Sequence, residues 1–154
     1  MKYESSLSSA QEYSRYDRTE EWIHLYLRSD GNNVALSDGL KLFPRYFLGP
    51  VYMPLSLFTR CTGPEENMKY RVDPQYFEKH VKELSSAIDS GSDMPPLIIH
   101  YLINDGNSEF ELTDGNHRHE AYSRLGITEI PVIIWISEKT ELDRFLLEYS
   151  SYLQ

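Results

Sequence analysis

Residues 112–121 join a strand pattern to a helix pattern, and they read Leu112-Thr113-Asp114-Gly115-Asn116-His117-Arg118-His119-Glu120-Ala121. Alternation before Asp114 predicts the end of a strand, and the apolar stripe that begins at Ala121 predicts a short helix. The first N–H groups of such a helix have no intrahelical partner, and the helix dipole adds partial positive charge there. Gly115 lets a ligand approach the backbone, while His117 and Arg118 add donors. The stretch therefore predicts an anion-binding site, and phosphate is the anion that we expect it to bind.

A plainer interpretation of the same residues stays open at this stage. Asp-Gly is a common turn, and Asp114 can serve only as a helix cap. His117 and Arg118 can equally be solvated side chains. A single strand–glycine–helix junction does not by itself separate a ligand site from a turn.

The segments around this junction follow patterns that are easily assigned. Asp73-Pro74 is typical of a helix start, and Phe77, Val81, Leu84 and Ile88 form the apolar stripe of an amphipathic helix. Residues 97–103 and 109–113 flank the turn Asn104-Asp105-Gly106-Asn107, which predicts a hairpin. A buried strand over 130–136 and a helix over 142–149 complete the order. This order predicts an α+β domain with a small mixed sheet flanked by helices.

The first half of the chain is less regular. Residues 1–20 are polar and form either a frayed lead-in or the first part of a helix, whereas Trp22, Ile23, Tyr26 and Leu27 mark one face of a helix. Prolines and glycines then predict a loop-rich stretch with a short strand at residues 51–53. Residues 59–71 are polar and predict an exposed loop, which contains the adjacent acids Glu65 and Glu66.

Composition narrows the class of protein. The chain has 154 residues, which favours one domain because domains average about 150 residues. Its net charge of −9 argues against DNA binding, since affinity for phosphate backbones comes from clustered Lys and Arg. The single cysteine, Cys61, excludes an internal disulfide and a Cys-based zinc site. The sequence contains no apolar run of membrane-spanning length and begins without the apolar core of a signal peptide, so we expect a cytoplasmic protein.

The junction and its surroundings resemble the ParB/sulfiredoxin superfamily. The resemblance rests on residues 114–122, on Leu125-Gly126-Ile127 and on Ile130-Pro131-Val132, with an entry strand, a helix and a strand upstream in matching order. It covers roughly residues 50–150. It implies a ParB/sulfiredoxin-like domain over residues 49–154, preceded by an N-terminal helical extension over residues 1–48.

The branches of this superfamily imply different activities. In sulfiredoxins the equivalent turn reads Gly-Gly-Cys-His-Arg, and the position of its reactive cysteine is Asn116 here, which argues against a true sulfiredoxin. ParB proteins bind CTP at this turn and carry a separate DNA-reading domain, for which we expect no room in this chain. The free-serine-kinase branch is the most similar in motif, because its turn reads Asp-Gly-His/Asn-His-Arg and residues 114–118 read Asp-Gly-Asn-His-Arg here. In that branch the turn binds nucleotide phosphates.

The resemblance implies roles for the residues of the turn. Asp114, Gly115, Asn116, His117 and Arg118 would bind a nucleoside triphosphate or diphosphate such as ATP, ADP or CTP. His117 would position the transferred group, Asp114 would cap the helix or help to hold Mg²⁺, and Glu65 or Glu66 would accept the proton of an attacking hydroxyl or water. These roles predict a phosphotransferase (kinase) or an NTPase (hydrolase) that acts on a small molecule.

Other functions remain open. The main alternative is a non-catalytic ParB-like module in which a bound nucleotide controls contact with a protein partner or a second copy of the chain. Residues 1–48 would then form the partner surface, and Glu65 and Glu66 would be solvated acids. A nuclease fits poorly with the charge of −9 and with the lack of clustered metal-binding acids.

Overall fold

A four-stranded mixed sheet forms the centre of the computed structural model, which describes residues 1–154. The strand order is β1-β6-β4-β5, with β4 parallel to β6 and with antiparallel pairs β1–β6 and β4–β5. The strands are β1 (Tyr46–Pro54), β4 (Leu97–Asn104), β5 (Asn107–Asp114) and β6 (Glu129–Ile136). The predicted α+β class, the hairpin and the small mixed sheet are confirmed.

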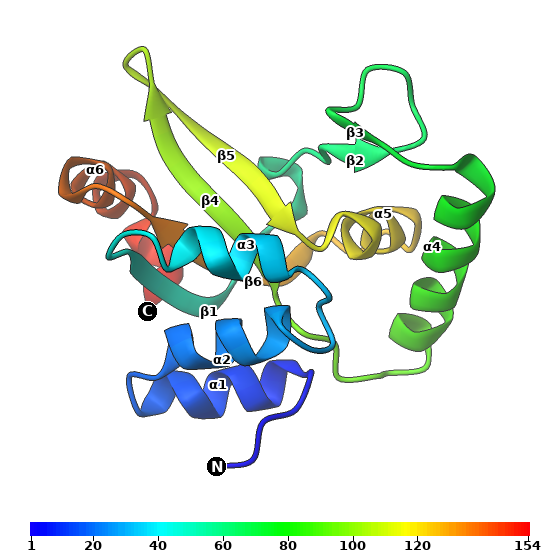
Figure 1. The fold of residues 1–154 in the computed structure, drawn as a ribbon, viewed down its shortest axis with the longest axis horizontal. Coiled ribbons are helices and arrows are strands. Elements are labelled where there is room, and N and C mark those ends of the chain that lie inside the picture. Colours follow the sequence, from blue (N-terminus) through cyan, green and yellow to red (C-terminus); the bar gives the residue numbers. More distant parts are fainter.

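Helices cover both faces of the sheet and one end of it (Figure 1). The helices are α1 (Leu7–Arg15), α2 (Thr19–Leu27), α3 (Val34–Leu40), α4 (Pro74–Asp89), α5 (Asn116–Arg124) and α6 (Lys139–Tyr149). Two 3-10 turns, η1 (Leu55–Leu57) and η2 (Ser150–Leu153), and a short parallel pair, β2 (Thr62–Gly63) with β3 (Tyr70–Arg71), complete the fold. None of the helices combines the length and the apolar character needed to cross a membrane.

Alternate residues of β6 point into two different cores, as expected for a strand buried on both faces. Val132, Ile134 and Ile136 belong to the core that includes Phe145 of α6. Ile133 and Trp135 belong to the core formed with the N-terminal helices. The sheet is therefore a central layer between α6 and the N-terminal helices α1–α3.

The N-terminal helices pack on the sheet through large aromatic and aliphatic side chains. Trp22, Ile23, Tyr26 and Leu27 of α2 are all buried, which confirms the helical face predicted there. The polar start of the chain also contains a helix, α1, whose Ala10 and Tyr13 join the same core. The expected boundary between residues 48 and 49 falls inside β1, so the first three residues of that strand belong to the segment 1–48.

The strand β1 is longer than the sequence indicates. Prolines and glycines restrict the prediction to residues 51–53, whereas β1 spans nine residues. Two features explain the difference. β1 lies at the edge of the sheet, where a missing N–H donor is tolerated, and its pairing with β6 shifts between Leu48 and Val51, around the Gly49–Pro50 step. The predicted loop at residues 59–71 likewise contains the short strands β2 and β3.

Candidate functional site

The helix α5 begins directly after β5 with a glycine in the left-handed conformation. Gly115 is the N-cap residue, with φ 105° and ψ 23°, and no side chain caps the helix. The first hydrogen bond of the helix runs from the His119 N–H to the Gly115 carbonyl at 2.9 Å. The N–H groups of Asn116, His117 and Arg118 therefore precede the intrahelical hydrogen-bond pattern.

The start of α5 differs from the start of every other helix. Side chains cap four helices, namely Ser6 on α1, Asn33 on α3, Asp73 on α4 and Glu138 on α6. The helix α2 lacks such a cap but has two acidic residues in its first turn, whereas α5 has neither a side-chain cap nor an acid there. The positive end of the α5 dipole is thus uncompensated within the helix, which favours an anion.

Arg118 is buried beneath this turn and keeps its charge. Its Nη1 donates to the Tyr26 hydroxyl at 2.9 Å, and its Nη2 donates to the Pro96 carbonyl at 3.2 Å and to Asp114 Oδ2 at 3.4 Å. Only 8% of the residue is exposed, and its Nε has no acceptor. Burial opposes the charge, but Tyr26 and Asp114 outweigh it and raise the pKa of Arg118. The first turn of α5 therefore lies beside a fixed cation.

A cavity of about 270 Å³ lies at the first turn of α5. Its wall includes all five residues of the turn, His80 from α4, and Ser5, Tyr26 and Asp30 from the N-terminal segment. Four larger hollows of about 320 to 710 Å³ lie beside Gly49, Arg45, Cys61 and Leu25, but Arg118 lines none of them. The chemistry of the walls, and not the size, singles out the cavity at α5.

His117 faces the helix α4 and is neutral near pH 7. Its ring centroid lies 4.6 Å from that of His80 and 5.1 Å from that of Phe77. Burial lowers the pKa of His117 to about 4, and the nearby His80, Arg118 and Arg60 act in the same direction. Its Nε2 has no partner in the protein. The neutral ring has one nitrogen that donates and one that accepts, and its buried Nε2 fills neither role within the protein.

The side chain of Asn116 is occupied by the protein itself. Its Oδ1 accepts hydrogen bonds from the N–H groups of Cys61 (2.8 Å) and Thr62 (3.1 Å), and its Nδ2 donates to the Leu112 carbonyl at 3.3 Å. These contacts tie the segment before β2 to the start of α5. Because both polar atoms of the Asn116 side chain are occupied, Asn116 can offer a ligand only its backbone N–H group.

Asp114 is paired with Arg118 and does not cap α5. Its second oxygen accepts from Asn33 Nδ2 at 3.4 Å. Proteins usually hold Mg²⁺ with one or two carboxylates, together with phosphate oxygens and water. Because Asp114 lies at the cavity wall, its carboxylate fits a Mg²⁺ ion carried by a nucleotide. The chain contains no group of three acidic, histidine or cysteine side chains that could hold a metal ion without the nucleotide.

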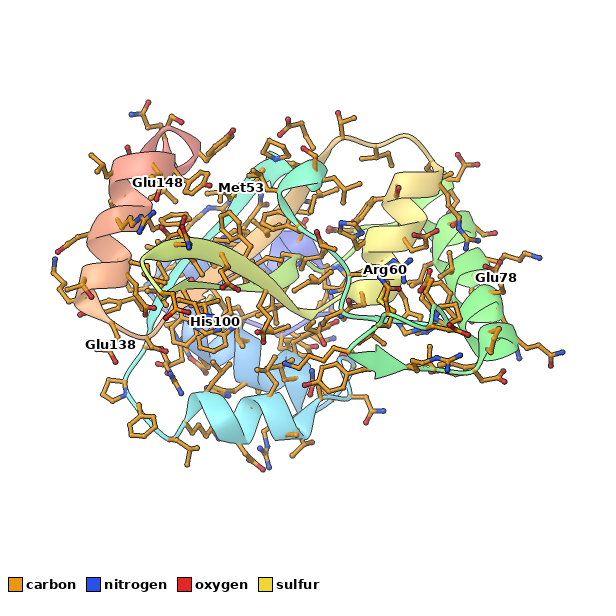
Figure 2. The ribbon with its side chains drawn as sticks, turned by 90° about the horizontal axis from the view of Figure 1, so that it is seen from above. Met53, Arg60, Glu78, His100, Glu138 and Glu148 are labelled. Carbon is orange, nitrogen blue, oxygen red and sulfur yellow. The ribbon has the colours of Figure 1, made fainter.

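The structure does not bring Glu65 and Glu66 to the cavity wall. Glu65 forms an ion pair with Arg60 (Nη2 to Oε1, 2.6 Å), which lowers the pKa of its carboxyl group, and Glu66 is exposed. Arg60 lies beside α5 (Figure 2), where its Nε is 3.3 Å from Glu120 and its guanidinium covers the Phe77 ring. Arg60 and Phe77 therefore separate Glu65 from His117.

Three residues of the cavity wall have no local signal in the sequence. Tyr26 has the spacing of an ordinary core residue, Asp30 lies in a turn pattern, and His80 lies beside the apolar stripe of its helix. Each becomes part of the site only in the folded chain, where the segment around Tyr26 reaches Arg118 and α4 packs beside α5. A signal for them would require knowledge of contacts between distant segments.

Solved structures that are similar to this chain include a sulfiredoxin and two ParB proteins. Sulfiredoxin from Arabidopsis thaliana has 26% sequence identity and a TM-score of 0.41, over 67% of this chain and 97% of that chain. The C-terminally truncated chromosome-partitioning protein ParB from Caulobacter crescentus, complexed with CTP-gamma-S, has 14% identity and a TM-score of 0.40, over 70% and 53% of the two chains. A Pnob8-like ParB-N domain has 15% identity and a TM-score of 0.41, over 70% and 37%. The match thus spans about half of the Caulobacter chain and less of the Pnob8-like chain.

Comparison with curated proteins finds no match for the chain. The sequence profile of the ParB N-terminal domain matches residues 65–149, which is more than half of the 154 residues. The matched region runs from the loop before α4 to the end of α6 and contains the whole first turn of α5. The chain therefore belongs to the ParB N-terminal domain family.

Proposed function

We propose that the cavity at α5 binds the phosphates of a nucleoside triphosphate or diphosphate, such as ATP, ADP or CTP. The observation that supports this proposal is the start of α5, where three backbone N–H groups lie beside the buried cation Arg118 and the first turn of the helix contains no acidic residue. Phosphate oxygens are the acceptors that such a turn favours. Gly115 keeps the turn open, because a Cβ there would lie 2.9 Å from Leu97 Cγ and 3.0 Å from Arg118 Nη2.

We further propose that the protein acts as a phosphotransferase or NTPase on a small molecule. The acceptor oxygen would attack the terminal phosphorus while the bond from that phosphorus to the bridging oxygen breaks, releasing the diphosphate and passing a proton to a carboxylate. His117, neutral at pH 7, would hydrogen-bond the transferred group. Asp114 would contribute an oxygen to Mg²⁺ carried by the nucleotide.

The proton acceptor in this reaction is one of three carboxylates. Glu65 and Glu66 are the candidates predicted from the sequence, and Asp30 joins them because it lines the cavity. Tyr3 donates to Asp30 Oδ2 at 2.7 Å and holds the carboxylate in place. We rank Asp30 first on position, since Glu65 is already paired with Arg60.

A second candidate function is a binding module without turnover. It is favoured by the pairing of Glu65 with Arg60 and by the position of Glu66 away from the cavity wall. In this case the bound nucleotide would change the contact between the protein and a partner or a second copy, and the three carboxylates would have no chemical role.

The binding step is tested by isothermal titration with ATP, ADP and CTP in the presence of Mg²⁺. We expect the wild-type protein to bind at least one of them, and Gly115→Ala to bind at least about tenfold more weakly, because its methyl group would press on Leu97 and Arg118. The control is Gly91→Ala, which has the same kind of backbone strain (φ 85°) but open space around it, and should bind like the wild type. Absence of binding to all three nucleotides contradicts the proposal.

The same protein samples separate the enzyme from the module. Release of phosphate, or phosphorylation of a compound in a panel of small hydroxyl compounds, indicates an enzyme, and binding without either indicates a module. Asp30→Asn should abolish turnover while leaving nucleotide affinity equal or higher, because it removes a negative charge from the cavity. Turnover that survives Asp30→Asn, Glu65→Gln and Glu66→Gln alike rules out all three carboxylates as the proton acceptor.

A further inference from the structure

Arg118 is held by a residue that lies outside the matched family domain. Tyr26 belongs to α2, whereas the family profile begins at residue 65. The Tyr26 hydroxyl accepts a hydrogen bond from Arg118 Nη1 at 2.9 Å, and the two residues are only 3% and 8% exposed. The N-terminal segment therefore contacts the buried cation of the candidate site directly.

The Tyr26 ring has little freedom to move. On one side it stacks on Trp22, with ring centroids 5.0 Å apart and an interplanar angle of 6°. On another side it lies against Gly31, where an added Cβ would be 2.6 Å from the ring atom Cε2. Trp22 itself is fully buried and donates through Nε1 to the Glu4 carbonyl at 3.1 Å. The hydroxyl is thus fixed at one place relative to Arg118.

The chemistry of Tyr26 suits a residue that orients a cation without cancelling its charge. Burial raises the pKa of the Tyr26 hydroxyl to about 12, so the group is neutral at physiological pH. A carboxylate at this position would orient the guanidinium equally well but would neutralise it. With a neutral acceptor on Nη1, Asp114 is the one acid paired with Arg118, and Tyr26 adds no second negative charge beside the first turn of α5.

We propose that Tyr26 is a positioning residue of the phosphate site, and that the N-terminal helical segment is a structural part of that site. Ser5 and Asp30 of the same segment also line the cavity. This proposal rests on the proposed nucleotide binding. It adds that residues outside the matched family domain set the orientation of the Arg118 guanidinium. Without the Tyr26 hydroxyl, Arg118 Nη1 would lose its acceptor, and the guanidinium would be held only through Nη2 by Pro96 and Asp114.

The test is a double-mutant cycle on Tyr26 and Arg118, with ATP and inorganic pyrophosphate as probes and unfolding midpoints measured in parallel. Tyr26→Phe keeps the ring and removes the hydroxyl, and should weaken both ligands about 10- to 100-fold, the size expected for the loss of one hydrogen bond to a charged group. In the Arg118→Gln background the same change should have no further effect. Tyr13→Phe is the matched control, because Tyr13 is equally buried in α1 but does not contact Arg118.

A second variant gives the same test without removing the hydroxyl. Gly31→Ala should displace the Tyr26 ring and weaken pyrophosphate binding to a similar extent. The role of Tyr26 is overturned if Tyr26→Phe and Gly31→Ala bind ATP and pyrophosphate as tightly as the wild type does. It is also overturned if Tyr26→Phe weakens binding as much in the Arg118→Gln background as in the wild type. A wild-type protein that binds neither ATP nor pyrophosphate overturns the proposed function itself, so the two failures are distinguishable.

Discussion

Arg118 is an enclosed cation with three oxygen partners: the Tyr26 hydroxyl and the Pro96 carbonyl from distant segments, and the Asp114 carboxylate four residues earlier in the chain. Removing a charge from water costs several kcal/mol, and the hydrogen bonds of these partners offset that cost. Loss of Arg118 would leave the carboxylate of Asp114 buried without its partner. Substitutions of Arg118 therefore change stability as well as ligand binding, and both must be measured on the same sample.

His117 leads to a prediction about acid stability. Its pKa is about 4 in the folded protein, against 6.5 for an ordinary histidine. As the pH falls from 6.5 to 4, the unfolded chain takes up a proton that the folded protein does not, so stability falls in this window and is unaffected by His117 above it. We expect the melting temperature of His117→Gln to fall less than that of the wild type between pH 6.5 and pH 4, as followed by circular dichroism. Parallel curves for the two proteins contradict the burial of a neutral His117.

At the scale of elements, the pair α4–α5 forms the wall of the site that faces away from the sheet. The two helices lie side by side (Figure 1) and share a small core of Phe77, Val81 and Ala121. An ion pair between Arg124 and Glu78 (2.6 Å) joins their exposed sides. Because His80 and Phe77 of α4 contact His117, the stability of α4 contributes to the geometry of the cavity.

The N-cap of α4 supplies the prediction at this scale. The Asp73 side chain accepts a hydrogen bond from the Tyr76 N–H at 2.9 Å. Asp73→Ala should lower the free energy of unfolding by about 1 kcal/mol, the usual cost of a lost cap, as measured by urea denaturation. Asp89→Ala, at the other end of the same helix, removes an acid from the negative end of the dipole and should leave stability equal or slightly higher. Equal losses for both variants contradict this account.

At the scale of the whole molecule, the N-terminal helices cover one face of the sheet. Ile98 of β4 and Ile133 and Trp135 of β6 are buried against α1, α2 and α3. The opposite face has its own core with α6. We therefore propose that residues 1–48 fold together with residues 49–154 and do not form a separable partner module.

Deletion of residues 1–48 tests this proposal. The remainder would expose an apolar sheet face and lose the first three residues of β1, so we expect insoluble protein, or a loosely packed state that binds the dye ANS and lacks near-ultraviolet circular dichroism. Solubility on expression and the two spectra provide the measurement. A soluble remainder that unfolds cooperatively shows instead that the extension is dispensable for folding.

Much of the fold could be predicted from short-range patterns. The helical face at Trp22–Leu27, the capped start of α4 at Asp73 and the hairpin turn at Asn104–Asn107 all appear in the structure where the sequence predicts them. Each depends on spacing within one or two turns of chain, which is local information. The strand β1 was predicted too short, because its prolines are tolerated only at a sheet edge, and edge position is not a local property.

Local patterns in the sequence are enough to predict the α+β order of elements and the strand–glycine–helix junction at residues 114–118. The tertiary structure alone decided that Arg118 is enclosed by Tyr26, 92 residues away, that Asn116 holds the segment before β2, and that Asp30 and not Glu65 lines the cavity. The physical reason is the range of the interactions involved. Periodicity and capping act between residues a few positions apart, whereas the cavity depends on which faces of α2, α4 and β5 are buried together, and only the packing of the whole chain selects that arrangement.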